Sequence, residues 1–261
     1  MPAKFILSLD CEGKWGVADR LTAVHRERLA DDPLAAAYGQ ILGLLDQHNV
    51  PATFAFAGLF SQSAAQFNVL RPEVEAFAAQ APGFLRPALA DIDSANGSGW
   101  HGAQLVQAVT HVKTPHEIAL HGVTHVPWTD MDDTLAAAEM ALFARLEGPV
   151  RSSRTFVFPR NLVAHETLLA LAGIVGYRQA PKSRSRAASL AAEFNTLAKA
   201  EQPLASSGPL AIPGGFFPYN APFQAGQPVT VTSSCNATST WLAQSTNPPA
   251  NPPAQRGERG R

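Results

Sequence analysis

The sequence predicts an α/β fold built on a parallel sheet, and three observations support this prediction. Short apolar runs alternate along the chain with longer stretches in which apolar residues recur every three or four positions, as strands alternating with helices do. The chain has 261 residues, 46% hydrophobic and 16% charged, which is enough for one sizeable core. Charged or polar side chains directly follow three of the apolar runs. We therefore expect one main α/β domain over residues 1–225.

The expected elements follow one another in the order that builds parallel sheets. Strands are expected over residues 4–9, 52–57, 117–120, 155–158 and 176–178. Helices are expected over residues 30–48, 130–147, 164–172 and 183–202. The first helix presents Leu34, Tyr38, Ile41 and Leu45 on one face, and Asp130 is the expected N-cap of the second helix.

Two segments lie outside this pattern. Residues 61–110 combine a helix-like stretch over 72–80 with Pro-rich and Ser/Gly-rich stretches, and we expect an insertion or lid there. Residues 226–261 are rich in Ser, Thr, Asn, Pro and Arg and have almost no apolar periodicity. Because such a segment buries too little apolar surface to offset its ordering entropy, we expect a disordered, low-complexity tail that is foreign to the domain or degenerate.

Composition and charge exclude several classes of protein. A net charge of −1 gives no general attraction to nucleic acid or to an anionic membrane surface. The apolar run near the N-terminus is too short for a signal peptide or a membrane span, which predicts a cytoplasmic protein. Cys11 and Cys235 are too far apart in sequence to indicate a disulfide framework or a zinc knuckle. No pattern indicates an oligomeric state.

Three of the expected strands end in residues that can carry chemistry. The first strand runs into Asp10 and Glu12, the third into His121 and His125, and the fourth into Arg160. Because the carboxyl ends of parallel strands form one rim, these side chains can converge. In a helical turn, residues four apart share a face, so His121 and His125 could reach one divalent ion. With a carboxylate as third ligand, such a site keeps a position open for water.

Simpler interpretations stand beside this one. Asp10 and Glu12 could be the solvated end of a strand, and a histidine pair at this spacing also arises by chance. Cys11 is expected to be a small core residue, because two neighbouring carboxylates would disfavour its thiolate. Trp15 and Trp128 fit the wall of a binding site and the core equally well.

Four stretches, taken in order, resemble the polysaccharide deacetylase family (NodB-homology, carbohydrate esterase family four). They are LSLDCEG at residues 7–13, ATFAF at 52–56, IALHGVTH at 118–125 and FVFPR at 156–160. The resemblance implies a distorted (β/α) barrel that holds a divalent metal ion, commonly zinc. It also implies hydrolysis of an N-acetyl or N-formyl group on an amino sugar, here of the cytoplasmic O-antigen and surface-polysaccharide type.

The resemblance implies a role for each matched residue. Asp10 matches the catalytic aspartate, which acts as general base. Glu12 stands where variants with a spaced acidic pair place the metal carboxylate, and Cys11 replaces the usual adjacent aspartate. His121 and His125 match the two metal histidines. Arg160 resembles the arginine that orients the aspartate, although Phe-Pro-Arg-Asn departs from the commoner order in which arginine precedes the prolines.

One expected part of the family pattern is missing. In that family a histidine of a late Leu-x-His-type motif protonates the leaving amine, but no histidine follows His165 in this sequence. Either His101 takes this role, or the barrel is incomplete at its C-terminal end, which would favour instability. The sequence thus predicts a deacetylase for an amino-sugar or a nucleotide- or lipid-linked sugar substrate. A non-catalytic, carbohydrate-binding or degenerate relative is the alternative.

Overall fold

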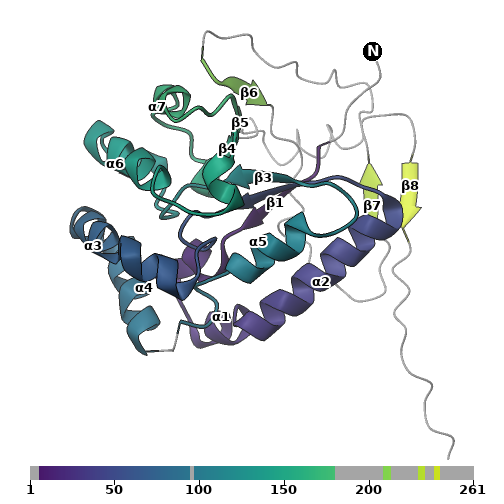
Figure 1. Cartoon of the computed structure of the whole chain (residues 1–261), viewed down its shortest axis with the longest axis horizontal. Helices are drawn as coiled ribbons and strands as arrows, with labels where there is room; N and C mark the ends of the chain where they lie inside the picture. Colours follow the sequence, from purple (N-terminus) through teal and green to yellow (C-terminus); the bar gives the residue numbers. More distant parts are fainter. Residues whose placement is uncertain (1–5, 95–96, 180–207, 213–228, 233–237, 242–261) are drawn as a thin grey trace, which may run out of the picture. The chain divides into compact units, whose positions relative to one another are not determined.

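The computed structural model describes residues 6–94, 97–179, 208–212, 229–232 and 238–241 (Figure 1). The chain divides into two units. One unit is Ile6–Phe216, and the other joins Met1–Phe5 to Phe217–Arg261. The predicted helix over 183–202 lies outside the described residues.

The larger unit is built on a parallel sheet whose strands follow chain order. These strands are β1 (Ser8–Cys11), β2 (Thr53–Phe56), β3 (Glu117–Leu120), β4 (Thr155–Val157), β5 (Gly176–Arg178) and β6 (Leu210–Ile212). Every neighbouring pair is parallel. The sheet curls into a half-barrel (Figure 1), which agrees with the prediction of an α/β fold and with an incomplete (β/α) barrel.

One face of this sheet carries large apolar side chains. Phe54 and Phe56 on β2, Leu120 on β3 and Phe156 on β4 are at most 1% exposed and belong to the main core cluster. Because side chains alternate along a strand, the residues between them point to the opposite face. The main core therefore lies on one side of the half-barrel.

The opposite face carries small and polar side chains. Ala55, Ala119 and Val157 form a separate small cluster there. Toward the amino ends of the same strands, the hydroxyls of Thr53 and Thr155 both donate to Glu117, at 2.6 and 2.7 Å. In the described residues, this face therefore combines a small apolar cluster with polar side chains.

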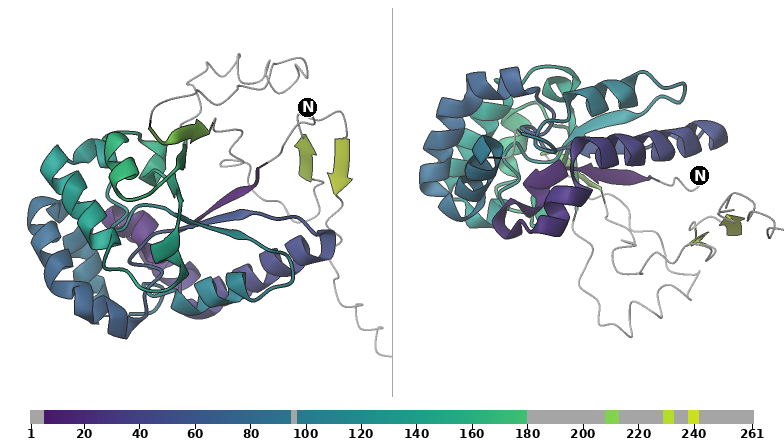
Figure 2. Two further views of the ribbon diagram at one scale, coloured as in Figure 1. Left: turned by 45° about the horizontal axis from the view of Figure 1, so that its top comes forward. Right: turned by 90° about the horizontal axis from the view of Figure 1, so that it is seen from below.

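The helices of this unit surround the core face. They are α1 (Ala23–Arg28), α2 (Asp31–His48), α3 (Ala64–Gln80), α4 (Pro82–Ser94), α5 (Ala103–Thr110), α6 (Asp133–Phe143) and α7 (Thr167–Leu171). The 3₁₀ turns are η1 (Gly13–Arg20), η2 (Trp128–Asp130), η3 (Pro149–Ser152) and η4 (Pro159–Asn161). Helices α2 and α5 lie side by side, and α3 packs against α4 and α6 (Figures 1 and 2).

Residues 61–110 differ from the insertion or lid that the sequence suggested. They form α3, α4 and α5, whose buried residues, such as Leu70, Leu85 and Val106, belong to the main core cluster. A capping box starts α3, because the Ser63 hydroxyl accepts from Gln66 N and the Gln66 side chain accepts from Ser63 N. The segment is thus a part of the core.

Two predicted boundaries need correction. Helix α6 begins at Asp133 with Asp132 as N-cap, whose carboxylate accepts from Leu135 N at 2.8 Å. Asp130 cannot fill that role because it belongs to the 3₁₀ turn η2. Strand β1 begins at Ser8, later than expected, and residues 4 and 5 lie outside the described residues.

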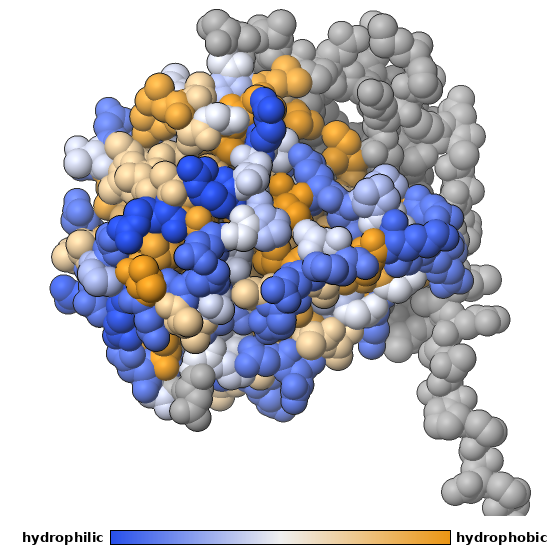
Figure 3. Space-filling view, viewed as in Figure 1, coloured by the Kyte–Doolittle hydropathy of each residue, from blue (hydrophilic) through white to orange (hydrophobic). Residues whose placement is uncertain are grey.

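The surface over α6 and α7 is comparatively apolar. Figure 3 shows weakly and strongly hydrophobic side chains gathered over these two helices. Leu171 at the end of α7 is 85% exposed. Helices α6 and α7 border a groove of about 350 Å³, to which Met140, Leu168 and Leu171 contribute.

The smaller unit contains two described strands. β7 (Val229–Thr232) and β8 (Thr238–Trp241) pair in antiparallel fashion. They lie in the segment 226–261 that was expected to be a disordered tail, and the rest of that segment lies outside the described residues. Among the described helices, none has the length and apolar character that crossing a membrane requires.

Candidate metal centre

The strand order of the sheet brings the first and third predicted motifs to one edge. Glu12 follows β1 directly and His121 follows β3 directly, and both strands pair with β2. His121 N donates to Phe56 O at 2.8 Å, which continues the sheet ladder one residue beyond the strand. The two motifs therefore lie at the same carboxyl edge, as expected for parallel strands.

Glu12, His121 and His125 form a compact cluster. Glu12 Oε2 lies 3.1 Å from His121 Nε2 and 2.5 Å from His125 Nε2. The imidazoles are 1% and 2% exposed, and their centroids are 4.9 Å apart. One candidate ligand atom from each residue lies within 4.8 Å of the other two. The structure thus brings together the three residues predicted as metal ligands.

The hydrogen bonding of His121 determines what can sit in this cluster. His121 Nδ1 lies 2.9 Å from Val157 O, and because a carbonyl only accepts, Nδ1 must carry the hydrogen. The neutral ring then presents the lone pair of Nε2 to the Glu12 carboxylate, which is also an acceptor. Two facing acceptors require a proton or a cation between them.

His125 points to the same conclusion. Neither of its buried ring nitrogens makes a hydrogen bond within the described residues, although Nε2 is close to Glu12. Two imidazole nitrogens and one carboxylate oxygen are a donor set typical of catalytic zinc sites. The bond from His121 Nδ1 to a carbonyl is the usual second contact of a metal-binding histidine. These residues therefore fit a divalent ion.

The charges of the cluster are coupled. Burial disfavours the charge of Glu12, but the close contacts with the His121 and His125 imidazoles outweigh it and hold the pKa of Glu12 well below its usual range. Burial also disfavours a charge on His121, yet the contact with Glu12 raises the pKa of His121. Burial lowers the pKa of His125. A negative carboxylate beside two imidazoles results.

The loop that carries the two histidines is not the helical turn that their spacing suggested. Gly122 and His125 both adopt the left-handed region, with φ of 65° and 62°. A side chain at Gly122 would also place its Cβ 2.7 Å from Pro159 Cγ. A non-glycine residue in this region is strained, and such strain is concentrated at functional sites. The imidazoles converge through an irregular loop.

A buried carboxylate on α6 holds this loop in place. Glu139 is 0% exposed, and its Oε1 accepts from Val123 N at 2.6 Å and from Thr124 N at 3.1 Å. Its Oε2 accepts from the Thr124 hydroxyl at 2.9 Å. Burial raises the pKa of Glu139 to about 7, against these three hydrogen bonds. The sequence analysis missed Glu139, whose one signal is a lone acidic residue on the buried face of an Ala- and Leu-rich helix.

The backbone of η1 leaves room for the Glu12 carboxylate. A Cβ added at Gly16 would overlap Glu12 Oε1 and the neighbouring side-chain carbons. The carboxylate therefore packs directly on the Gly16 backbone. Glycine at this position allows Glu12 to reach the two imidazoles.

Asp10 borders the cluster but contacts a different arginine from the one predicted. Its Oδ2 lies 3.9 Å from His121 Nε2. Arg178 on β5 donates to both Asp10 oxygens, at 2.8 Å each. Arg160 instead pairs with Asp19 in η1, at 2.6 Å, and its guanidinium lies 4.8 Å from the Phe84 ring centroid.

The expected contact between Arg160 and Asp10 is therefore not made. Arg160 and Asn161 adopt φ of 56° and 57°, so the chain turns sharply after β4 and aims the Arg160 side chain at η1 and α4. The sequence analysis missed Arg178, because an arginine in the short strand 176–178 gave no signal of its own.

The remaining candidates have structural surroundings. Cys11 is 4% exposed and donates to Leu9 O, and burial raises the pKa of its thiol, so it is a core residue as expected. Trp15 and Trp128 are also core residues, at 1% and 0% exposure. His101 packs on the Phe67 ring, away from the contacts of the cluster.

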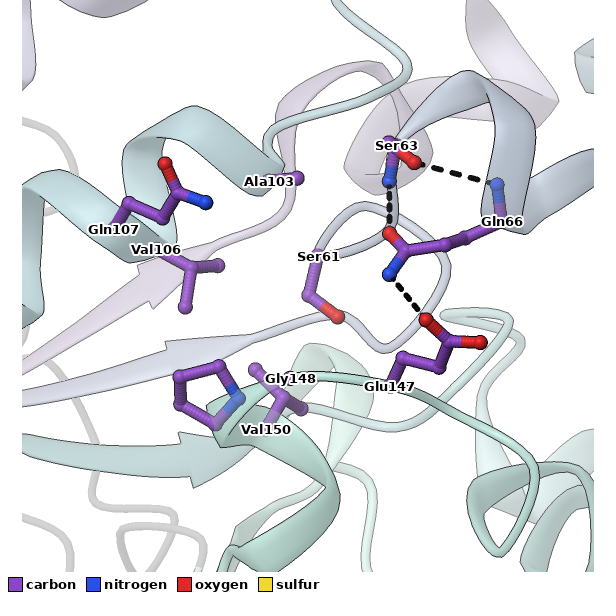
Figure 4. Close-up of a pocket in the computed structure, with 10 residues that line it drawn as sticks. Ser61, Ser63, Gln66, Ala103, Val106, Gln107, Glu147, Gly148 and Val150 are labelled. Atoms are coloured by element: carbon purple, nitrogen blue, oxygen red, sulfur yellow. Dashed lines mark hydrogen bonds between the residues drawn. The ribbon is translucent and has the colours of Figure 1, made fainter.

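A pocket of about 240 Å³ lies elsewhere in the same unit (Figure 4). Its polar lining includes Ser61, Gln66 and Glu147, and the Gln66 amide donates to Glu147 Oε2 at 2.7 Å. Neither Asp10 nor any residue of the cluster lines it. The pocket and the candidate metal centre are therefore formed by different residues.

Comparisons with known proteins add little to this geometry. No family model matches the chain, and no curated protein sequence matches it. Among solved structures, the chain is similar to a crystal structure from Mycobacterium smegmatis described as a "putative polysaccharide deacetylase". The identity is 15% and the TM-score 0.42, over 85% of this chain and 68% of that chain. A likeness of this extent establishes neither a family nor a function.

Proposed function

We propose that this protein is a divalent-metal-dependent hydrolase that removes an N-acyl group, acetyl or formyl, from an amino sugar. The observation that carries the proposal is the convergence of Glu12, His121 and His125 on one point, 3.1 Å or less between the carboxylate oxygen and each imidazole nitrogen. The ordered resemblance of the sequence motifs to polysaccharide deacetylases supports the choice of reaction.

Glu12, His121 and His125 would hold the ion, for which zinc is the leading candidate. When bound, a divalent ion of this kind polarises a carbonyl oxygen and lowers the pKa of a water molecule toward neutrality. The protein contributes a fixed donor set, because Val157 O fixes the His121 ring and the Gly16 backbone leaves room for Glu12. Near-complete burial of both imidazoles keeps bulk water away from them.

Asp10 is the residue that we assign to proton transfer. Its carboxylate lies next to the cluster, and the bidentate contact with Arg178 fixes its orientation. It takes the proton of the attacking water as the oxygen bonds to the amide carbon. It then returns that proton to the amine nitrogen as the carbon–nitrogen bond breaks. Water and amide are consumed, and a carboxylic acid and an amine are formed.

This double role follows from the surroundings of the other histidines. His101 packs on Phe67, and His165 contacts Asp133 Oδ1 and Met131 O. In the part of the chain that the structure describes, we find no histidine besides the pair in contact with Asp10 or Glu12. Asp10 is thus proposed as both base and acid.

The proposed substrate is an N-acylated amino sugar, free or linked to a nucleotide or lipid carrier. The proposed setting is cytoplasmic assembly of a surface polysaccharide such as O-antigen. This substrate class follows from the motif resemblance.

The test combines metal analysis with release of acetate or formate. Wild type purified with zinc should retain about one ion per chain and release acetate or formate from an N-acyl amino sugar. The double variant His121→Ala, His125→Ala should lose both properties, because it removes two of three ligands. A matched variant, His25→Ala with His111→Ala, removes two histidines outside the cluster, of which His25 is half-buried and His111 exposed, and should keep both properties.

Two results would contradict the proposal. Equal metal content in the cluster variant and the wild type would show that the ion binds elsewhere. Metal binding with sugar binding but no turnover would favour the alternative, a carbohydrate-binding protein that lacks a general acid. The observation that favours this alternative is the absence of a further histidine beside the cluster in the described residues.

A further inference from the structure

Arg178 makes an unusual set of contacts for a strand residue. Its two terminal nitrogens donate to the two oxygens of Asp10 at 2.8 Å, so the pair is bidentate. Nη1 also donates to Ser8 Oγ at 2.9 Å, and Nε donates to Asn161 Oδ1 at 3.1 Å. The side chain is 11% exposed. The guanidinium is therefore fixed by partners from β1 and from the loop after β4.

These contacts cross the half-barrel. β1 and β5 are separated by three strands in the sheet. In a flat sheet they would be about 19 Å apart, at about 4.8 Å for each neighbouring pair, beyond the reach of one side chain. Arg178 reaches Asp10 because the sheet curls toward the face that both residues share. That face is therefore the concave one.

The neighbouring residues leave space for this crossing. The register places Asp10 beside Ala55 and Ala55 beside Ala119, while Arg178 lies beside Val157. Ala55, Ala119 and Val157 are small residues and almost fully buried. Larger side chains at these positions would occupy the path between β5 and β1.

We propose that Arg178 is the positioning residue for Asp10 and ties β5 to β1 across the concave face. The two strands share no hydrogen-bond ladder, so the contact of this side chain with Asp10 links them directly across the concave face. The bidentate pair fixes both oxygens of Asp10, and with them the direction of its free lone pairs. As a positioning role this inference rests on the proposed hydrolase function, whereas the tie itself does not.

The tie is tested by a double-mutant cycle on unfolding of the metal-free protein. The four proteins are wild type, Asp10→Asn, Arg178→Gln and the double variant. Arg178→Gln should change the unfolding equilibrium constant about tenfold more in the wild type than in the Asp10→Asn variant. Equal effects in both backgrounds would overturn the tie.

The chain offers a matched control for this cycle. Arg71 and Asp93 form a bidentate pair with the same 2.8 Å distances, but the pair lies between α3 and α4 and Asp93 is 55% exposed. The cycle of Arg71→Gln and Asp93→Asn should give about a twofold coupling or less, as exposed pairs do. If Arg71 and Asp93 were coupled as strongly as Arg178 and Asp10, the contact across the concave face would add no more stability than an exposed ion pair does.

The positioning role is tested by the kinetics of acetate or formate release. In the zinc-loaded protein, Arg178→Gln should lower kcat about 100-fold and leave KM and zinc content near wild type, since misplaced catalytic groups cost about that much. Arg178→Lys keeps the positive charge but cannot donate to both Asp10 oxygens as the guanidinium does, so its kcat should lie between those of Arg178→Gln and the wild type. The Arg71→Gln variant should match wild type.

The outcomes separate the two proposals. Wild-type kcat in Arg178→Gln, or a loss of zinc that accounts for the loss of rate, would overturn the positioning role. A wild type that binds zinc but hydrolyses no N-acyl sugar would overturn the hydrolase and the positioning role together. The double-mutant cycle would in that case still decide whether Arg178 ties the two strands.

Discussion

Glu139 determines the shape of the histidine loop although it touches neither imidazole in the described contacts. Its two carboxylate oxygens take up the N–H groups of Val123 and Thr124 and the Thr124 hydroxyl. Because Glu139 accepts hydrogen bonds from these groups, the loop is stable without the backbone hydrogen bonds of a helix. His125 is then free to adopt the left-handed conformation that turns its ring toward Glu12.

The buried Glu139 carboxyl should make stability depend on pH. The pKa of Glu139 is about 7 in the folded protein, above the ordinary value of 4.5. Between pH 4.5 and 7 the folded state therefore keeps a proton on this carboxyl that the unfolded state has lost. Stability should therefore fall as pH rises from about 4.5 to 7, by at most about 1.4 kcal/mol per pH unit. It should level off above pH 7.

The measurement compares wild type with Glu139→Gln by denaturant unfolding of metal-free protein at several pH values. Gln keeps Oε1 as an acceptor, and the Thr124 hydroxyl can accept from the new amide. The stability of wild type relative to the variant should decrease from pH 5 to 7. Parallel curves for the two proteins would contradict the prediction.

Sequence reasoning identified the cluster residues for a physical reason and missed their neighbours for another. Asp10, Glu12 and His121 lie in or directly after strands, where parallel topology alone makes them meet. Arg178 and Glu139 depend on the curl of the sheet and on the packing of α6, which no local pattern reports. Arg160 was matched by its position after a strand, but a left-handed turn directs it elsewhere.

At the scale of elements, the start of α6 shows how local chemistry sets a boundary. Asp132 accepts from Leu135 N, whereas Asp130 lies in the preceding 3₁₀ turn. The helix that begins here carries Glu139 on its buried face. A change at the N-cap Asp132 would therefore affect the helix that positions Glu139 against the histidine loop.

Asp132→Ala should lower the free energy of unfolding by about 1 kcal/mol, because it removes an N-cap. Asp130→Ala is the matched control and should change the stability by less than about 0.5 kcal/mol, as surface changes usually do. Thermal and denaturant unfolding of both variants provide the measurement. A larger effect for Asp130 would show that the cap lies where the sequence first placed it.

The helices of residues 61–110 explain the largest difference between expectation and structure. Pro72 lies inside α3 and Pro87 inside α4, and proline is normally a helix breaker. Burial of Phe67, Leu70 and Val74 against the core outweighs the lost backbone hydrogen bond. By contrast, α2 was predicted closely because its apolar spacing continues up to its C-cap, Asn49, whose left-handed backbone ends the helix.

Across the whole molecule, a buried ion network joins segments that are distant in sequence. Asp91 on α4 accepts from Lys14 in η1 at 3.3 Å and from Trp100 Nε1 at 2.9 Å, and it pairs with Arg26 on α1 at 2.5 Å. The Lys14 side chain is 2% exposed and that of Asp91 is 3% exposed. The network fixes η1, the turn that directly follows Glu12.

Asp91→Ala should therefore destabilise the protein strongly. It leaves the buried Lys14 ammonium without a partner carboxylate, which typically costs about 3–5 kcal/mol. Asp93→Ala removes a neighbouring carboxylate that is 55% exposed and should cost less than about 1 kcal/mol. Urea unfolding compares the two, and similar losses would mean that the buried network adds no stability.

The parallel strands could be predicted from the sequence, and the family resemblance implied a barrel, but the side chains that meet across the curled sheet could not be predicted. The apolar runs at 52–57 and 117–120 indicate buried strands. Because helical crossovers join consecutive strands, few topologies other than a parallel sheet remain. The small residues Ala55 and Ala119 signal the concave face only after the register is known. The contacts across that face therefore became visible only in three dimensions.

Gly16 determines whether Glu12 can reach the two imidazoles, although glycine has no side chain that could contact them. The backbone angle φ at this residue is not one that favours glycine, so alanine would not strain the backbone there. The extra methyl group would nevertheless occupy the place of the Glu12 carboxylate. The variant Gly16→Ala would therefore separate Glu12 from the two imidazoles while all three proposed ligands remain in the sequence.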